Sequence, residues 1–362
     1  MTDATTTNPR DLLQQAQQLP HGPEKVALLS EAARQADVLR DTDLAYRIRD
    51  DLIDAASHAG DAPTMITAFA WCLQHADRDE EGFRAYSLLW RYKWVLGGAM
   101  SLPAIPLARI EALVRDYEER LERGGHSKRP AARYRLLLAL HVENDEAVRD
   151  AYAAWRALKP GWLDCQACER QTLVQYHLHT GAPGRALQAA RPLLEGRFGC
   201  NRVPGVTLGA LLLPLLQLGR AEEADAHHAR GYALVCGTDD MLSTHADHLT
   251  YLALRGRTDD ARRVYRRHLP YALRTREPDE ALDYHTAAAV LFRMLEGTGK
   301  TRVRAALPEH AAPRRADGSY AAHDLRAYHE AEAYRIARLF DTRNGTDAHA
   351  RHVTRKLALV SA

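Results

Sequence analysis

The chain has 362 residues, of which 27% are charged and 46% hydrophobic, and its formal net charge at pH 7 is +2. This composition is typical of a globular protein that can bury a hydrophobic core without the support of disulfide bonds. The near-neutral charge argues against a dedicated nucleic-acid-binding protein, which usually carries a strong positive excess. The longest apolar stretch, 206–218, is interrupted by Pro214 and is too short to span a bilayer. Since the first residues also lack a secretory pattern, we expect a cytoplasmic protein that binds neither nucleic acid nor membrane.

Helical patterns follow one another along the chain, and runs typical of strands are nearly absent. We expect residues 1–9 to be a disordered tail and residues 10–362 to form a single all-α domain with a loop at about 301–319. The apolar periodicity predicts helix pairs at about 11–78, 80–123, 129–158, 164–197, 204–236, 240–273, 278–297 and 320–360.

Glycines recur at a nearly constant interval between these helices. The spacing is 38, 38 and 37 residues for the pairs Gly60/Gly98, Gly181/Gly219 and Gly219/Gly256. Asn144 occupies the same place 37 residues before Gly181. A glycine supplies the positive φ that ends a helix, so the interval predicts a helix–turn–helix unit of about 38 residues.

A small residue follows several of these turns at a fixed distance. Alanine lies five residues after the glycine at Ala186, Ala224 and Ala261, and acidic residues precede two of these alanines. An acidic residue favours the start of a helix, and alanine allows two helices to approach closely.

On these residues, the segment 171–269 resembles the tetratricopeptide-repeat (TPR) family, whose repeat has a turn glycine and an alanine five residues later. The interval here is 37–38 residues rather than the family's 34, and the family's tryptophan, glycine and tyrosine of the first helix are not cleanly present. The resemblance implies an α-solenoid, in which stacked antiparallel helix pairs form a right-handed superhelix with a concave binding face.

The best candidate for a metal site is a group of three cysteines. Cys165 and Cys168 form a C-x2-C pair at the expected start of a helix, and Cys200 follows 35 residues after Cys165, close to one repeat. Neighbouring helices pack about 8–10 Å apart, so the three sulfurs can converge on one ion. The sequence therefore predicts a structural zinc site with an unknown fourth ligand, for which Asp164 and Cys236 are candidates. The alternative is that these cysteines are small buried apolar residues.

The histidines His245, His248 and His268 invite a second metal interpretation, because positions i and i+3 share a helix face. No glutamate stands between the first two as in H-E-x-x-H zinc sites. We expect packed or solvated histidines here.

The first functional hypothesis is a non-enzymatic bacterial scaffold that binds a protein or peptide on the concave face. The repeat register places five polar residues on that face: Gln171, Gln175, His179, Gln217 and Thr250. Two alternatives stay open, namely a regulatory sensor that responds to a signalling peptide and a metal-dependent enzyme that uses the cysteine or histidine clusters.

Overall fold

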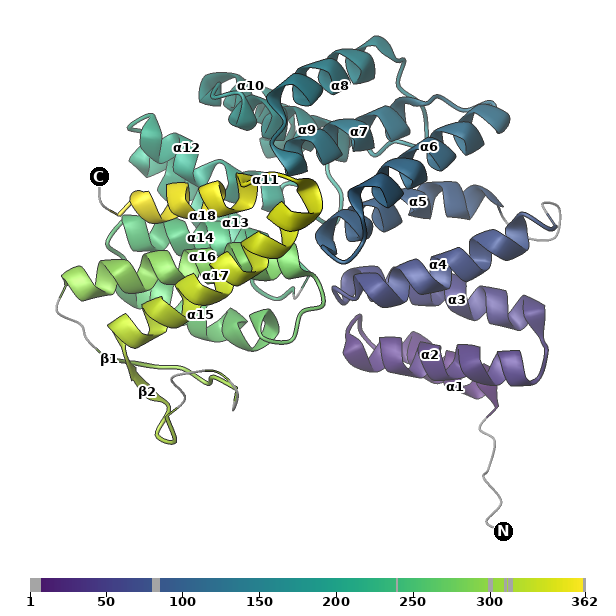
Figure 1. Cartoon of the computed structure of the whole chain (residues 1–362), viewed down its shortest axis with the longest axis horizontal. Coiled ribbons are helices and arrows are strands. Elements are labelled where there is room, and N and C mark those ends of the chain that lie inside the picture. Colours follow the sequence, from purple (N-terminus) through teal and green to yellow (C-terminus); the bar gives the residue numbers. More distant parts are fainter. Residues whose placement is uncertain are drawn as a thin grey trace. The chain divides into compact units, whose positions relative to one another are not determined.

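The computed structural model describes residues 8–79, 85–238, 240–298, 302–308, 311 and 315–360. Helices make up most of these residues, and β1 and β2 are the only strands in this part of the chain, so the predicted all-α class is confirmed (Figure 1). The expected tail lies outside the described residues as far as position 7, and the first helix already begins at Pro9. No helix in the described ranges is both long enough and apolar enough to cross a membrane.

The chain divides into two compact units, Met1–Leu102 and Pro103–Ala362. Each is described by itself, and the single continuous domain expected from the sequence stays a prediction.

The first unit consists of five helices that pack in chain order, each against the next. Their shared core contains the buried side chains of Leu29, Ile48 and Phe69. Asp41 and Asp61 cap the third and fourth helices, because their carboxylates accept backbone N–H groups of the following turn. The helices are α1 (Pro9–Gln18), α2 (Pro23–Val38), α3 (Thr42–His58), α4 (Ala62–Ala76) and α5 (Ala85–Ser101).

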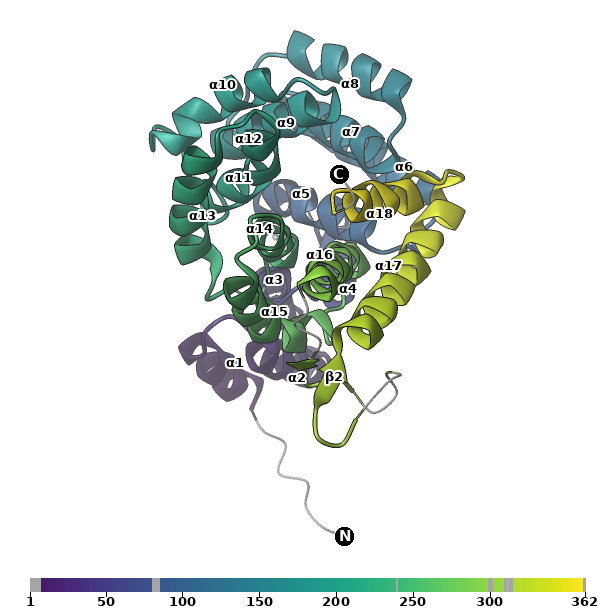
Figure 2. The same cartoon turned by 90° about the vertical axis from the view of Figure 1, so that its left-hand side faces the viewer.

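The second unit contains successive helix hairpins and one short pair of strands. Its elements are α6 (Leu107–Arg123), α7 (Arg129–Val142), α8 (Asp145–Ala157), α9 (Gln166–His179), α10 (Pro183–Leu194), α11 (Gly205–Ala210), α12 (Leu212–Gln217), α13 (Ala221–Val235), α14 (Leu242–Leu254), α15 (Thr258–Ala272), α16 (Pro278–Gly297), β1 (Arg302–Arg304), β2 (Ser319–Ala321), α17 (Ala322–Asn344) and α18 (Ala348–Ala358). Within this unit, α8, α10 and α13 lie on the outside, and α14, α16 and α18 lie nearer the middle (Figure 2).

The predicted turns are confirmed at most positions. Gly60, Gly181, Gly219 and Gly256 all have positive φ, between 64° and 72°. At the turn for which the sequence predicted Asn144, the residue with positive φ is Glu143, at 54°. Asn144 caps the next helix, because its side chain accepts the N–H of Ala147. The alanines five residues after the turn glycines are completely buried, as expected for close helix contacts: Ala186, Ala224 and Ala261.

Gly98 is the exception, and the expectation of a turn there was wrong. It lies inside α5 and is buried. A Cβ at this position would lie 2.6 Å from Cε of Met65 and 3.1 Å from Cβ of Ala62, so the glycine allows α5 to approach α4. Glycine spacing alone does not distinguish a turn from a close helix contact.

Most of the apolar stretch 206–218 is buried, as predicted, with Leu208, Leu212 and Leu215 fully buried, but its end is not, since Leu218 is 43% exposed. Pro214 does interrupt it, since the helix divides at Leu211 into α11 and α12. A proline clashes with the carbonyl four residues before it, which places the disturbance at the end of α11.

The predicted loop at about 301–319 carries a small antiparallel ladder at its two ends. Val303 pairs with Tyr320, both are buried, and their neighbours Arg302 and Ser319 point away from the core. The expectation of a simple loop was wrong here because a strand of three residues is shorter than the alternating runs that identify strands in a sequence. Residues 301, 309, 310 and 312–314 lie outside the described part.

The last two helices return to the beginning of the second unit. A guanidinium nitrogen of Arg343 in α17 lies 2.7 Å from Nε2 of His141 in α7, and Arg355 in α18 donates to Glu143 over 2.7 Å. These contacts join residues about 200 positions apart in the sequence. The unit is therefore closed by its C-terminal helices, whereas a simple stack of repeats has contacts only between neighbours.

Candidate functional site

The three predicted cysteines come together at the start of α9. Cys165 is the residue immediately before the helix, Cys168 lies in its first turn, and Cys200 lies in the connection from α10 to α11. Their sulfur atoms lie within 4.8 Å of one another, and Sγ of Cys168 is 4.0 Å from Sγ of Cys200. A tetrahedral zinc ion with Zn–S bonds of about 2.3 Å holds its sulfurs about 3.8 Å apart. The cluster therefore has the spacing of a thiolate metal site.

Hydrogen bonds within the cluster favour a thiolate at Cys200. The neighbouring thiols of Cys165 and Cys168 lower the pKa of Cys200, and the backbone amides of Arg202 and Val203 contribute in the same direction. The same contacts raise the pKa of Cys168, because its proton is held between sulfurs. Amides that support a metal-binding sulfur in this way are typical outer-shell groups of metal sites.

Positive charge lies close to these sulfurs. Arg133 is buried and donates to Oγ1 of Thr172, whose hydroxyl in turn donates to the carbonyl oxygen of Cys168. Arg133 and Arg202 both interact electrostatically with Cys168. Three thiolates around a divalent ion carry one net negative charge, which these guanidinium groups would offset.

Neither of the two candidates for the fourth ligand is part of the cluster. Cys236 directs its thiol to the carbonyl oxygen of Ala233, and Asp164, although it precedes Cys165, is not among the groups whose ligand atoms converge in the described residues. A fourth coordination position would therefore be filled by water or by another molecule.

The histidines of α14 and α15 are packed core side chains, as expected. His245 and His268 stack with their ring centroids 3.7 Å apart, and Nδ1 of His248 lies 3.0 Å from Nδ1 of His228. Burial lowers the pKa of His268 to about 3. Burial also lowers the pKa values of His228 and His248, and the histidines do not form a convergent ligand set in the part of the chain described.

A group that the sequence analysis missed lies in the first unit. His21, Asp54 and His58 place ligand atoms within 4.8 Å of one another. Asp54 and His58 are one turn apart on α3, while His21 lies between α1 and α2. The helical spacing was a detectable signal, but nothing in the sequence brings His21 beside it. Nδ1 of His58 lies 2.9 Å from the carbonyl oxygen of Asp54, so this nitrogen is engaged within the helix.

The five residues expected to face a partner have different surroundings. Gln175 and Gln217 are exposed, whereas Gln171 accepts a hydrogen bond from Thr207 and His179 lies 2.9 Å from Asp145. Thr250 is only 2% exposed, so the expectation that it faces a partner was wrong. The reason is that α14 is packed between other helices of the second unit and has no open face at this position.

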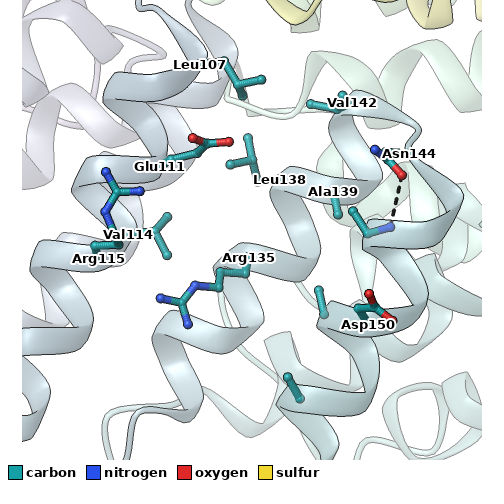
Figure 3. A pocket seen from close by; sticks show the side chains of 13 residues that line it. Leu107, Glu111, Val114, Arg115, Arg135, Leu138, Ala139, Val142, Asn144 and Asp150 are labelled. Atoms are coloured by element: carbon teal, nitrogen blue, oxygen red, sulfur yellow. Dashed lines mark hydrogen bonds between the residues drawn. The ribbon is translucent and has the colours of Figure 1, made fainter.

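An apolar groove does open elsewhere, along α7 between α6 and α8 (Figure 3). Its cavity volume is about 640 Å³, within the usual range of binding pockets. Charged residues of both signs stand among the apolar ones: Glu111, Arg115, Arg135 and Asp150. The apolar lining is Leu107, Val114, Leu138, Ala139, Val142, Ala147, Ala151 and Ala154.

Comparison with known proteins adds no family to this description. No protein-family model matches the chain, and no curated protein was found to match it. The resemblance to the TPR family therefore rests on the sequence and stays a prediction.

Proposed function

We propose that the chain is a non-enzymatic scaffold that binds a helical segment of another protein. In this proposal it is built as a TPR-like right-handed solenoid of stacked helix pairs. Two observations support the stacking, namely the positive-φ glycines between paired helices and the contacts of α7 with α9, α11 with α14, and α14 with α16.

The apolar groove between α6 and α8 carries the proposal of binding. Its floor is α7 and its walls are the two flanking helices, an arrangement that can receive the apolar face of a third helix. Charged residues of both signs can pair with a partner's polar positions and fix its register. This groove replaces the concave-face residues as the surface that we would test first.

Two neighbouring alanines of α8 provide a matched test of the groove. Ala153 and Ala154 are both exposed, but only Ala154 lines the groove. A photo-crosslinking amino acid at position 154 should capture a discrete protein partner in the native cell, and the same group at position 153 should not. A Val142→Arg substitution in the groove should abolish the adduct. Equal labelling from both positions, or none from position 154, would refute the assignment.

We further propose that zinc binds Cys165, Cys168 and Cys200 and fastens the start of α9 to the connection between α10 and α11. The sulfur spacing supports this, and an ion that joins these two parts of the fold would add to its stability. Metal analysis of protein purified without chelators should find about one equivalent of zinc. Less than about a tenth of an equivalent would remove the zinc site from the proposal without affecting the groove.

A further inference from the structure

The C-terminal helix α18 is a basic helix that lies on acidic residues of other helices in the second unit. Arg351 and Arg355 both approach Glu143, which follows α7, at 3.9 and 2.7 Å. Nζ of Lys356 lies 3.9 Å from Asp247 of α14. His352 lies 4.0 Å from Asp283 of α16. Three carboxylates from three parts of the unit therefore face one short helix, which lies near the middle of the unit in Figure 2.

The same helix has an apolar face directed into the core. Val353 is completely buried and Leu357 is 6% exposed. At its C-terminal end, Arg293 of α16 donates to the carbonyl oxygen of Leu357 over 3.1 Å. Thus α18 packs in the way that an amphipathic helix binds in a groove: its apolar side chains are buried and its cations pair with the surrounding carboxylates.

The surface beneath α18 requires cations from whatever covers it. Burial raises the pKa of Asp247 to about 6, and the nearby Lys356 partly opposes this rise. The Asp247 side chain is 31% exposed, so a covering helix without a cation at this place would leave a half-buried carboxylate unpaired, which is costly. The acidic surface therefore discriminates in favour of a basic amphipathic helix.

The attachment of α18 combines buried apolar contacts with ion pairs that are open to solvent. It has 11 residues and follows Gly345, whose φ of 67° allows a sharp change of direction after α17. The cations Arg351 and Arg355 are more than half exposed, and solvent screens such pairs so that each adds little to the stability of the folded chain. A helix that is held in part by such exposed pairs opens more readily than the core.

We infer that the acidic surface of Glu143, Asp247 and Asp283 is a binding site for a basic amphipathic helix of a partner protein, and that α18 is its built-in competitor. This inference rests on the proposed scaffold function but uses a different surface from the groove between α6 and α8. A failure here would leave the crosslinking result at Ala154 unchanged, so the two can be distinguished.

The test uses a labelled alanine-based peptide that carries only the spacing of Arg351, Val353, Arg355, Lys356 and Leu357. The full-length variant Val353→Asp/Leu357→Asp, in which α18 is released, should bind this peptide at least tenfold more tightly than the unmodified chain. The same peptide with glutamate at the three cationic positions should not bind, and binding should weaken with salt. The inference is overturned if both chains bind equally, if the acidic peptide binds as well, or if only the native sequence 346–360 binds, since α18 would then be a specific structural cap.

Hydrogen exchange on the unmodified chain decides the question if the double variant does not fold. At saturating peptide, the amides of α18 should exchange at least tenfold faster while those of α16 stay unchanged. Unchanged exchange in α18 under these conditions would overturn the inference.

Discussion

A buried pair of histidines in the second unit makes stability depend on pH in a way that a single substitution can test. Nδ1 of His285 in α16 lies 2.8 Å from Nδ1 of His329 in α17, and Nε2 of His329 lies 3.0 Å from the hydroxyl of Tyr265. One of the two Nδ1 atoms must be an acceptor. A further proton on that atom would turn two N–H groups toward each other, so the pair is stable only when neutral.

The magnitude of this pH dependence follows from the shift in the pKa of His285. Burial is the main cause that lowers the pKa of His285 from 6.5 to about 4; the charge of Arg335 adds to the shift and that of Glu332 opposes it. Between these two pH values the unfolded chain carries a proton on this ring and the folded chain does not. The free energy of unfolding therefore falls as the pH falls through this window, by about 1.4 kcal/mol per pH unit. Over the whole window His285 contributes about 3 kcal/mol, which is fully present above pH 6.5.

His285→Leu should remove this dependence. Urea unfolding of the variant and of the unmodified chain at several pH values between 7 and 4.5 should give pH slopes that differ by about one proton. The variant will be less stable at pH 7, because His329 loses a partner. Asp247 and Asp279 change the free energy of unfolding with pH in the opposite direction, because burial raises their pKa values to about 6 and about 7. Both groups are present in both proteins, so their effect cancels in the comparison.

His323→Leu is the matched control, because this side chain is 70% exposed and its replacement should leave the slope unchanged. The reasoning is refuted if His285→Leu has the same pH slope as the unmodified chain.

Three further predictions concern packing and the cysteine cluster. Gly97→Ala should raise the free energy of unfolding by about 0.5–1 kcal/mol, because a Cβ there meets no atom within 4 Å. Gly98→Ala should lack this gain, because its Cβ would lie 2.6 Å from a methionine methyl group. Equal effects of the two substitutions in urea unfolding would contradict this. Trp155→Ala should lower the free energy of unfolding by about 3–5 kcal/mol, since the side chain is fully buried, and a loss below about 1 kcal/mol would show that it is not a core residue. Cys168→Ser should lower the zinc content in metal analysis and the Tm in calorimetry. Cys236→Ser should leave the zinc content unchanged. An equal loss of zinc from both variants would contradict the three-sulfur site.

Local features of the fold could be predicted from the sequence because single residues determine them. A positive φ is a property of one residue, so Gly181 and Gly219 identify their turns without any knowledge of tertiary structure. Gly98 was assigned wrongly because its role depends on a methionine in another helix. Residue type alone does not determine burial either, since Trp155 is fully buried whereas Trp162 is 57% exposed.

The cysteine cluster could be predicted in part, for the same reason. The convergence of Cys165 and Cys200 follows from the interval of the repeat, which brings corresponding positions of adjacent helix pairs together. The amides of Arg202 and Val203 that support Cys200 belong to an irregular connection, whose path periodicity does not describe. The sequence therefore predicts which sulfurs meet but not what stabilises their charge.

The proposed partner-binding surface was the least predictable feature, because it depends on contacts between distant parts of the chain. A repeat interval describes how one helix pair contacts the next, and on that basis Thr250 belonged to an open face. The contact of Arg355 with Glu143 spans 212 residues and closes the second unit, which the interval does not encode. Because this closure depends on a short basic helix over acidic residues, the exposed surface of the unit is set by the position of α18. Release of that helix should therefore change which surface is available to a partner, while the hairpins that the glycines define stay intact.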